Sequence, residues 1–158
     1  MAIAARPDDL ISSIHFQTIA AVPLAIIAPN IDCSVKQAWQ AETVDWANLP
    51  IILPEHGVAR KRFERWFRDK HQGRPNVYAQ VSGQEALVSM VALGCGVGLS
   101  PIVVVDNSPV KERIQILPDT SIAPFDFGLC CFKKTLDDPI VAEFMAMANE
   151  PVKTSVSL

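Results

Sequence analysis

Two short polar segments of the chain could bind a small ligand. Each follows an apolar stretch and precedes a predicted helix, and their six residues are Glu55, His56, Gly57, Ser82, Gly83 and Gln84. A helix N-terminus carries free backbone N–H groups and the positive end of the helix dipole, and both favour an anion. Glycine allows the backbone to approach a ligand closely. The two segments therefore predict a binding site for a small anion, with side-chain hydrogen bonds to the rest of the ligand.

These residues also have purely structural interpretations. Ser82 and Glu85 have the spacing of a capping box, so Ser82 could cap a helix without touching a ligand, or do both. His56 could be an ordinary loop residue. Catalysis is disfavoured, because neighbours such as Glu55 and His56 seldom converge on one substrate and no nucleophile has a base and an orienting group. We therefore expect no catalytic residue and no enzyme.

The second polar segment lies within a predicted strand–helix–strand unit at residues 81–101. A strand ends at Val81, a helix runs to Gly94, and a second strand ends at Pro101. Such units build parallel sheets, and ligands of these sheets bind beyond the carboxyl ends of the strands. The glycines of this unit close a helix and enter a strand, the reverse of their order in a dinucleotide fingerprint. Their spacing therefore does not indicate dinucleotide binding.

Strand and helix patterns alternate along the rest of the chain, which is typical of an α/β fold. We expect strands at residues 1–5, 14–17, 19–28, 51–53, 77–81, 113–117 and 125–132. Residues 31–48 are mixed in character, with one helical turn at residues 45–49. A last helix starts at Asp138 and Pro139. Its predicted apolar face consists of Ile140, Val141, Phe144, Met145 and Ala148.

The predicted helix over residues 58–70 is unusually basic. Its cations are Arg60, Lys61, Arg62, Arg65, Arg68 and Lys70. They could form a phosphate-binding face. We favour a solvated or protein-binding face with ion pairs Glu64–Arg68 and Arg65–Asp69, because no exposed aromatic residues alternate with the cations. Its aromatic residues, expected in the core, are Phe63, Trp66 and Phe67.

The composition excludes several classes of function. A net charge of −3 argues against nucleic-acid binding by the chain as a whole. No apolar run of about 18 residues predicts a membrane span, and the first ten residues lack a signal-peptide core, so we expect a cytoplasmic protein. No metal-ligand spacing links histidines with cysteines or carboxylates, so we expect no metal and no cofactor. We expect reduced, mostly buried thiols at Cys33, Cys95, Cys130 and Cys131.

The sequence resembles the C-terminal effector-binding domain of LysR-type transcriptional regulators. The resemblance rests on residues 86–101, a helix followed by a glycine-rich strand and Pro101, on residues 125–134, and on Asp138-Pro139. Residues 24–29 resemble the strand before the crossover between lobes. The resemblance implies a two-lobed, periplasmic-binding-protein-like (type II) fold with an effector between the lobes. It places lobe I at residues 1–35 plus 120–158 and lobe II at residues 36–119.

The resemblance also implies what this chain does not carry. Family members have an N-terminal helix-turn-helix domain and a linker helix, and neither is found in this sequence. The first strand and helix of the effector domain are also expected to be absent, so the fold is expected to be N-terminally truncated. DNA would be bound only through the missing domain, and self-association as a homo-oligomer belongs to the full-length protein. No membrane partner is implied.

Four segments narrow the resemblance to activators of branched-chain amino-acid biosynthesis. They are Asp45-Trp46, residues 60–68, residues 84–90 and residues 107–109. This resemblance implies a small anionic co-inducer, 2-acetolactate or 2-aceto-2-hydroxybutyrate. A stand-alone or transport-type binding protein of the same fold is the alternative, and the missing signal peptide argues against it.

Overall fold

The computed structural model describes residues 1–71, 73–117 and 122–148. The chain divides into two compact units. Unit 1 combines Met1–Ala21 with Phe125–Leu158, and unit 2 is Val22–Pro124. The chain thus enters unit 2 well before residue 36, the predicted start of lobe II, because the strand after Pro23 pairs within unit 2. The other predicted boundary, at residues 119 and 120, lies outside the described residues.

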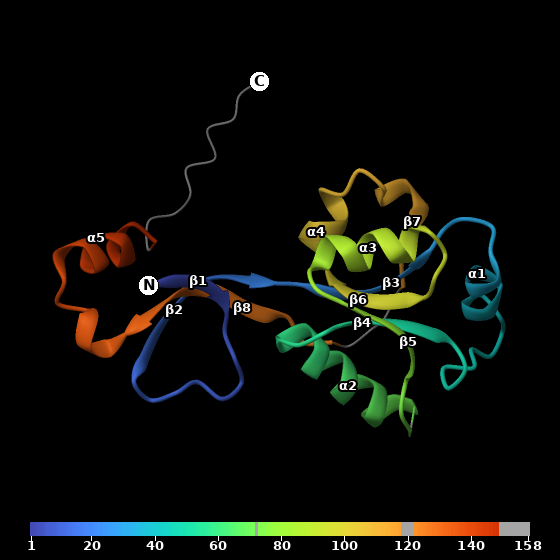
Figure 1. Ribbon diagram of the computed structural model, residues 1–158, viewed down its shortest axis with the longest axis horizontal. Helices are drawn as coiled ribbons and strands as arrows, with labels where there is room; N and C mark the ends of the chain where they lie inside the picture. The colour runs from blue at the N-terminus through green and yellow to red at the C-terminus, as the bar shows by residue number, and fades with distance from the viewer. Residues whose placement is uncertain (72, 118–121, 149–158) are drawn as a thin grey trace. The chain divides into compact units, whose positions relative to one another are not determined.

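Unit 2 is built on a five-stranded mixed sheet in the order β5-β4-β6-β3-β7 (Figure 1). β4 runs parallel to both of its neighbours, β5 and β6, whereas β3 is antiparallel to β6 and β7. Every residue of β3 and β6 is buried, as expected for continuous apolar strands covered on both faces. The strands are β3 (Leu24–Pro29), β4 (Pro50–Pro54), β5 (Asn76–Val81), β6 (Val97–Pro101) and β7 (Ile114–Ile116).

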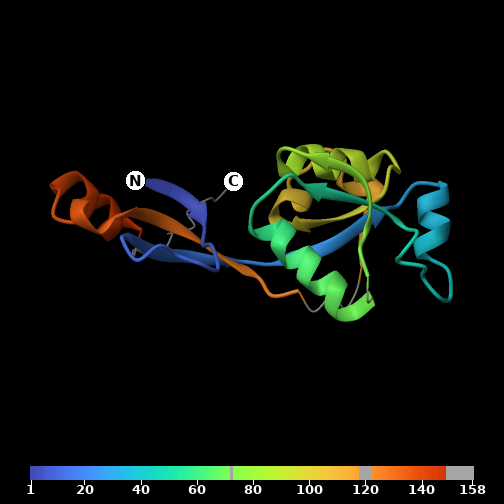
Figure 2. The ribbon, with the colours of Figure 1, turned by 60° about the horizontal axis from the view of Figure 1, so that its bottom comes forward.

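Helices cover both faces of this sheet. α2 (Val58–His71) and α3 (Gln84–Ala92) lie on opposite faces (Figures 1 and 2). α2 buries Phe63 and Phe67, as predicted, and α3 buries an apolar stripe against Ile27 and Ile52 of the sheet. The shorter elements of unit 2 are α1 (Ser34–Trp39), α4 (Ile102–Asp106) and the 3-10 turn η1 (Lys111–Arg113).

Unit 1 has a three-stranded sheet in the order β1-β8-β2, with one helix packed on it. β1 runs antiparallel to β8, with Ile3 opposite Leu129. The unit's small core joins Leu129 and Cys131 of β8 to Met145 of the helix. Its elements are β1 (Ala2–Ala5), β2 (Ile14–Val22), β8 (Phe125–Phe132), the 3-10 turn η2 (Lys133–Thr135) and α5 (Pro139–Met147).

Four local expectations differ from the structure. The predicted strand over residues 19–28 is divided between β2 and β3 at Pro23, which has no N–H to donate to a ladder. α1 was not predicted, because its N-cap is the Cys33 thiol, which accepts from the Lys36 backbone N–H at 3.4 Å instead of a usual capping oxygen. Of the four free cysteines, only Cys131 is buried.

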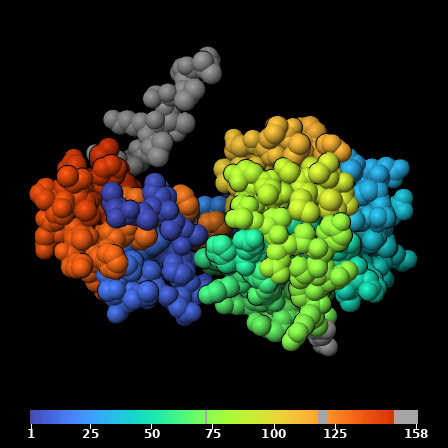
Figure 3. All heavy atoms as spheres, viewed as in Figure 1, coloured from blue at the N-terminus to red at the C-terminus, as the bar shows by residue number. Residues whose placement is uncertain are grey.

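The exposed face of α5 is the fourth difference. Asp138 caps this helix as predicted, accepting from the Ile140 N–H at 2.9 Å. Ile140 and Phe144, expected on the apolar face, are 70% and 50% exposed. Val141, Met145 and Ala148 are the ones that pack inward, because the narrow sheet covers only that side. The atoms of α5 accordingly form an outer surface of unit 1 (Figure 3).

Candidate ligand-binding site

The two predicted polar segments start at the same edge of the unit 2 sheet. β4 and β5 are adjacent and parallel, and their last residues, Pro54 and Val81, lie side by side. The Glu55 backbone N–H donates to the Val81 carbonyl at 3.0 Å, which joins the two strand ends. Glu55, His56 and Gly57 therefore lie beside Ser82, Gly83 and Gln84 where α2 and α3 begin. All but Gln84 are exposed to solvent.

Both helices start after a glycine in a left-handed conformation. Gly57 has φ +99° and Gly83 has φ +94°, values that side-chain-bearing residues rarely adopt. The carbonyl groups of these glycines accept the first helical hydrogen bonds, from Lys61 at 3.3 Å and Leu87 at 3.4 Å. The backbone geometry of glycine thus sets both helix starts.

The predicted capping box at Ser82 is wrong. Gly83 is the N-cap of α3, and no side chain caps it. Because the left-handed turn falls at Gly83, Ser82 lies one residue too early to accept the N–H groups of the first turn. The N-terminus of α3 therefore presents backbone donors that no capping side chain satisfies, and Glu85 is the acidic residue of this turn.

Gln84 adds an acceptor to this edge. Its side-chain carbonyl oxygen is buried, and no hydrogen-bond partner for it exists among the residues that the structure describes. A buried carbonyl without a donor is unfavourable by about 1–3 kcal/mol, so this atom needs a hydroxyl or a water. The edge thus combines backbone donors suited to a carboxylate with one acceptor suited to a hydroxyl group.

Arg60 positions this edge and was missed by the sequence analysis, which treated it as one charge of a basic helix. Its guanidinium donates to the carbonyl groups of Pro54 at 3.1 Å and Glu55 at 3.0 Å, and to the Gln80 side chain at 3.0 Å. Its Nε also pairs with Glu64 at 2.8 Å. One side chain on α2 therefore clamps the ends of β4 and β5, a role that only their pairing reveals.

A second polar feature lies at the end of the neighbouring strand. The chain leaves β4 through α2 toward β5 on one side and leaves β6 through α4 toward β7 on the other, so the connections from these adjacent strands run in opposite directions. Such reversal points are where open α/β sheets bind ligands. Ser100, at the carboxyl end of β6, is fully buried, and its hydroxyl donates to the Pro101 carbonyl at 3.3 Å. The sequence contained no signal for it beyond its position before Pro101.

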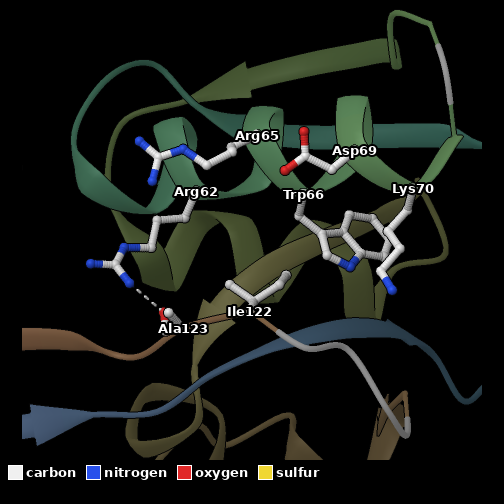
Figure 4. Close-up of a pocket in the computed structure, with 7 residues that line it drawn as sticks. All are labelled: Arg62, Arg65, Trp66, Asp69, Lys70, Ile122 and Ala123. Atoms are coloured by element: carbon white, nitrogen blue, oxygen red, sulfur yellow. Dashed lines mark hydrogen bonds between the residues drawn. The ribbon is translucent and has the colours of Figure 1, made fainter.

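A separate pocket of about 210 Å³ lies along α2 (Figure 4). Arg62, Trp66 and Lys70 extend from the helix toward Ile122 and Ala123. Arg62 donates to the carbonyl groups of Ala123 at 2.7 Å and Pro124 at 2.5 Å. The full lining is Arg62, Arg65, Trp66, Asp69, Lys70, Ile122 and Ala123. Trp66, predicted in the core, is only half-buried and forms a wall of this pocket.

Aromatic contacts hold that wall in place. The ring centroid of Trp66 lies 5.2 Å from that of Trp46 and 5.0 Å from that of His71. Trp46 in turn stacks on His71 at 4.8 Å. The turn that carries Trp46 is the predicted one: Leu49 N–H donates to the Asp45 carbonyl, and the Asn48 amide holds the pKa of the Asp45 carboxyl below its usual value.

His71 makes the stability of this cluster pH-dependent. Burial first, and the Lys70 charge second, lower the pKa of His71 below its usual 6.5. The neutral imidazole is therefore favoured in the folded state, so its contribution is complete above pH about 6.5 and lost as the pH falls toward the folded pKa. We expect the urea midpoint followed by tryptophan fluorescence to fall between pH 7.5 and 5, and H71F to flatten that fall. An equal fall in H71F would show that other groups cause it.

Metal-ligand clusters and membrane-spanning helices are both absent from the described residues. Within the described ranges, no three histidine, cysteine or carboxylate side chains gather as metal ligands. No helix among the described residues is both long and apolar enough to cross a membrane.

Comparisons with known proteins place the chain in a family. The LysR substrate binding domain family matches residues 1–152. The HTH-type transcriptional activator IlvY of Haemophilus influenzae is 40% identical over 93% of this chain and 51% of its own length. The HTH-type transcriptional regulator IlvY of Escherichia coli is 41% identical over 91% of this chain and 50% of its own. The chain thus spans about half the length of these relatives, whose names describe transcriptional regulators.

Solved structures agree on the fold. The regulatory domain of Synechocystis CcmR, solved with 2-PG, matches with a TM-score of 0.71 and 18% identity over 92% of this chain and 70% of that one. The effector-binding domain of QuiR, solved with shikimate, has a TM-score of 0.71 and 15% identity over 92% and 68% of the two chains. The predicted α/β, type II periplasmic-binding-protein-like fold is confirmed. With its family matching almost every residue, the chain belongs to the LysR substrate-binding domains.

Proposed function

We propose that this chain is the effector-sensing domain of a LysR-type regulator whose effector is an acetohydroxy acid, 2-acetolactate or 2-aceto-2-hydroxybutyrate. Effector binding would control transcription of branched-chain amino-acid biosynthesis. The observation that carries the proposal is the pair of helix starts at Gly57 and Gly83, side by side at one sheet edge. The identity of about 40% to IlvY regulators supports the choice of effector.

The ligand's groups match the donors and acceptor of this edge. Its carboxylate would accept from the backbone N–H groups at the starts of α2 and α3, where the helix dipoles favour negative charge. Its tertiary hydroxyl would donate to the buried Gln84 carbonyl oxygen. Arg60 would act as a positioning residue, because its bonds hold the two strand ends rather than the ligand.

The partners follow from the family. A regulator of this type would bind DNA through an N-terminal domain and act as a homo-oligomer, and it would work in the cytoplasm, where its DNA is. The relatives are named as regulators, so we propose no catalytic step for the acetohydroxy acid.

Calorimetric titration and thermal unfolding with 2-acetolactate test the proposal. A ligand at about one hundred times its Kd should stabilise the folded chain by about 2.7 kcal/mol and raise its Tm by several degrees. Q84L should weaken binding by about tenfold, since it removes one hydrogen bond to an uncharged group. E85Q is the matched control on the same helical turn. It removes a negative charge near the carboxylate, so it should bind at least as tightly as the original chain.

Two results would contradict the proposal. One is the absence of binding heat and of any Tm shift at about 10 mM 2-acetolactate, a concentration on the order of the Kd of the weakest specific complexes. Circular dichroism must show in the same experiment that the protein is folded. The other is equal binding by Q84L and the original chain, which would place the ligand away from the start of α3.

A further inference from the structure

We propose that the pocket along α2 is a second binding site, for a small monocarboxylate with an apolar body. The site does not depend on the function proposed above. The pocket begins at Arg62 and extends toward Lys70, whereas the proposed effector edge lies at the first turn of α2. The basic character of this helix was noted from the sequence, and the effector edge accounts only for Arg60.

The pocket has an apolar floor, which is not expected for a helix face that is only solvated. The half-buried indole of Trp66 and the buried side chain of Ile122 face the same cavity (Figure 4). Four aromatic neighbours at centroid distances of 5.0–6.4 Å restrain the indole. A flat apolar wall packed in this way suits the body of a small ligand, because little further ordering of the site is needed on binding.

Cations stand at both ends of this floor. Arg62, Trp66 and Lys70 are spaced four residues apart, so they form one stripe of α2 with the indole between two positive charges. Arg65 adds a third positive charge to the lining. Arg62 also bonds the Ala123 and Pro124 carbonyl groups, which fixes the far wall of the pocket against the helix. The pocket is thus held open by a bond that does not require a ligand.

The lining suits an anionic ligand that also has an apolar body. Three cations and one carboxylate line the pocket, and that carboxylate, Asp69, lies 3.9 Å from the Arg68 Nε outside the lining set. The lining therefore has an excess of positive charge that attracts an anion, and the apolar floor of Trp66 and Ile122 favours a carboxylate with an apolar body over inorganic phosphate. At about 210 Å³ the cavity is smaller than drug-sized sites, so the ligand has on the order of ten heavy atoms.

Phenylacetate is the probe that tests this site, and phenylacetamide is its uncharged isostere. Excitation at a wavelength where only tryptophan absorbs should report phenylacetate binding as a change in the total tryptophan emission, because Trp66 lines the pocket. We expect phenylacetamide to bind at least about fivefold more weakly, because the charge contributes about 1 kcal/mol at a partly exposed site. Inorganic phosphate should bind more weakly than phenylacetate, because it cannot use the apolar floor.

Variants locate the site on the chain. K70Q should weaken phenylacetate binding by about fivefold, whereas K61Q, an exposed cation of the same helix outside the pocket, should not change it. A123F should abolish binding by filling the cavity from its exposed rim. Q84L should leave phenylacetate affinity unchanged, so loss of the effector edge and loss of this pocket are distinguishable.

Three outcomes would overturn the proposal. One is equal affinity for phenylacetate and phenylacetamide, which would show an apolar surface without an anion site. Another is tighter binding of phosphate than of phenylacetate, which would show a purely electrostatic helix face. The third is equal loss in K70Q and K61Q, which would place the anion outside the pocket.

Discussion

Replacing Phe63 by alanine is expected to lower the free energy of unfolding of unit 2 by about 3–5 kcal/mol. The ring is completely buried, and it contacts the rings of Trp66 and Phe67 at centroid distances of 5.7 and 5.9 Å. It anchors the middle of α2 to the sheet. Its removal leaves a cavity that neighbouring aromatic rings cannot fill without leaving their own contacts. Arg60 and the pocket residues lie on the same helix, so both binding sites should weaken as well.

Urea unfolding followed by tryptophan fluorescence measures this effect. All three tryptophans, Trp39, Trp46 and Trp66, belong to unit 2, so their emission reports on that unit alone. F63L keeps most of the apolar volume and should cost clearly less than F63A. Y78A is the control for losing an exposed aromatic ring, because Tyr78 is 64% exposed, and its cost should stay below about 0.5 kcal/mol. A cost for F63A below about 1 kcal/mol would contradict the described packing of α2.

Replacing Gly128 by alanine is expected to disrupt the unit 1 sheet. A Cβ on Gly128 would overlap the backbone carbonyl oxygen of Gln17 and lie 3.0 Å from the Phe16 ring. The strands β8 and β2 are neighbours, so only their separation relieves this overlap. The core cluster described in unit 1 has three buried residues, Leu129, Cys131 and Met145, so it has little reserve of burial. We expect a loss of about 3 kcal/mol, at the upper end for overpacking, because the obstructing atoms are backbone.

Hydrogen–deuterium exchange with mass spectrometry measures this change, since unit 1 contains no tryptophan. Amides of β1 and β8 in G128A should exchange much faster, while those of the unit 2 sheet keep their protection. C130A changes a half-buried residue of the same strand and should leave exchange nearly unchanged. Unaltered protection of β8 in G128A would refute the described close approach of β8 to β2 at Gly128.

Most elements could be predicted from the sequence because their signals are local. The strand–helix–strand pattern of residues 81–101 needed only apolar periodicity and the glycines that end each element. Asp138 followed by Pro139 marked the start of α5 for the same reason. The family resemblance rests on such stretches, so it could also be identified before any tertiary contact was known.

The two polar segments show which features of the site the local sequence can and cannot predict. Their position between apolar strands and helix starts predicted a common binding site, and the parallel pairing of β4 with β5 brings the two segments to the same sheet edge. The identity of the cap was not predictable. Serine is preferred over glycine at helix N-caps, but the left-handed backbone at Gly83 shifts the helix start by one residue. Whether Glu55, His56, Gly57, Ser82, Gly83 and Gln84 bind a ligand stays a prediction.

The sequence by itself determined the α/β alternation, most of the helix and strand positions, and the residue types available for anion binding. These depend on backbone preferences and periodicity within about ten residues, which no distant contact has to supply. The tertiary structure decided that Arg60 clamps two strand ends 5 and 20 residues away, that Trp66 lines a pocket, and that Ile140 and Phe144 face solvent. Each of these outcomes depends on which strands are neighbours in the sheet. Strand order is set by the packing of the whole unit rather than by any local stretch of sequence.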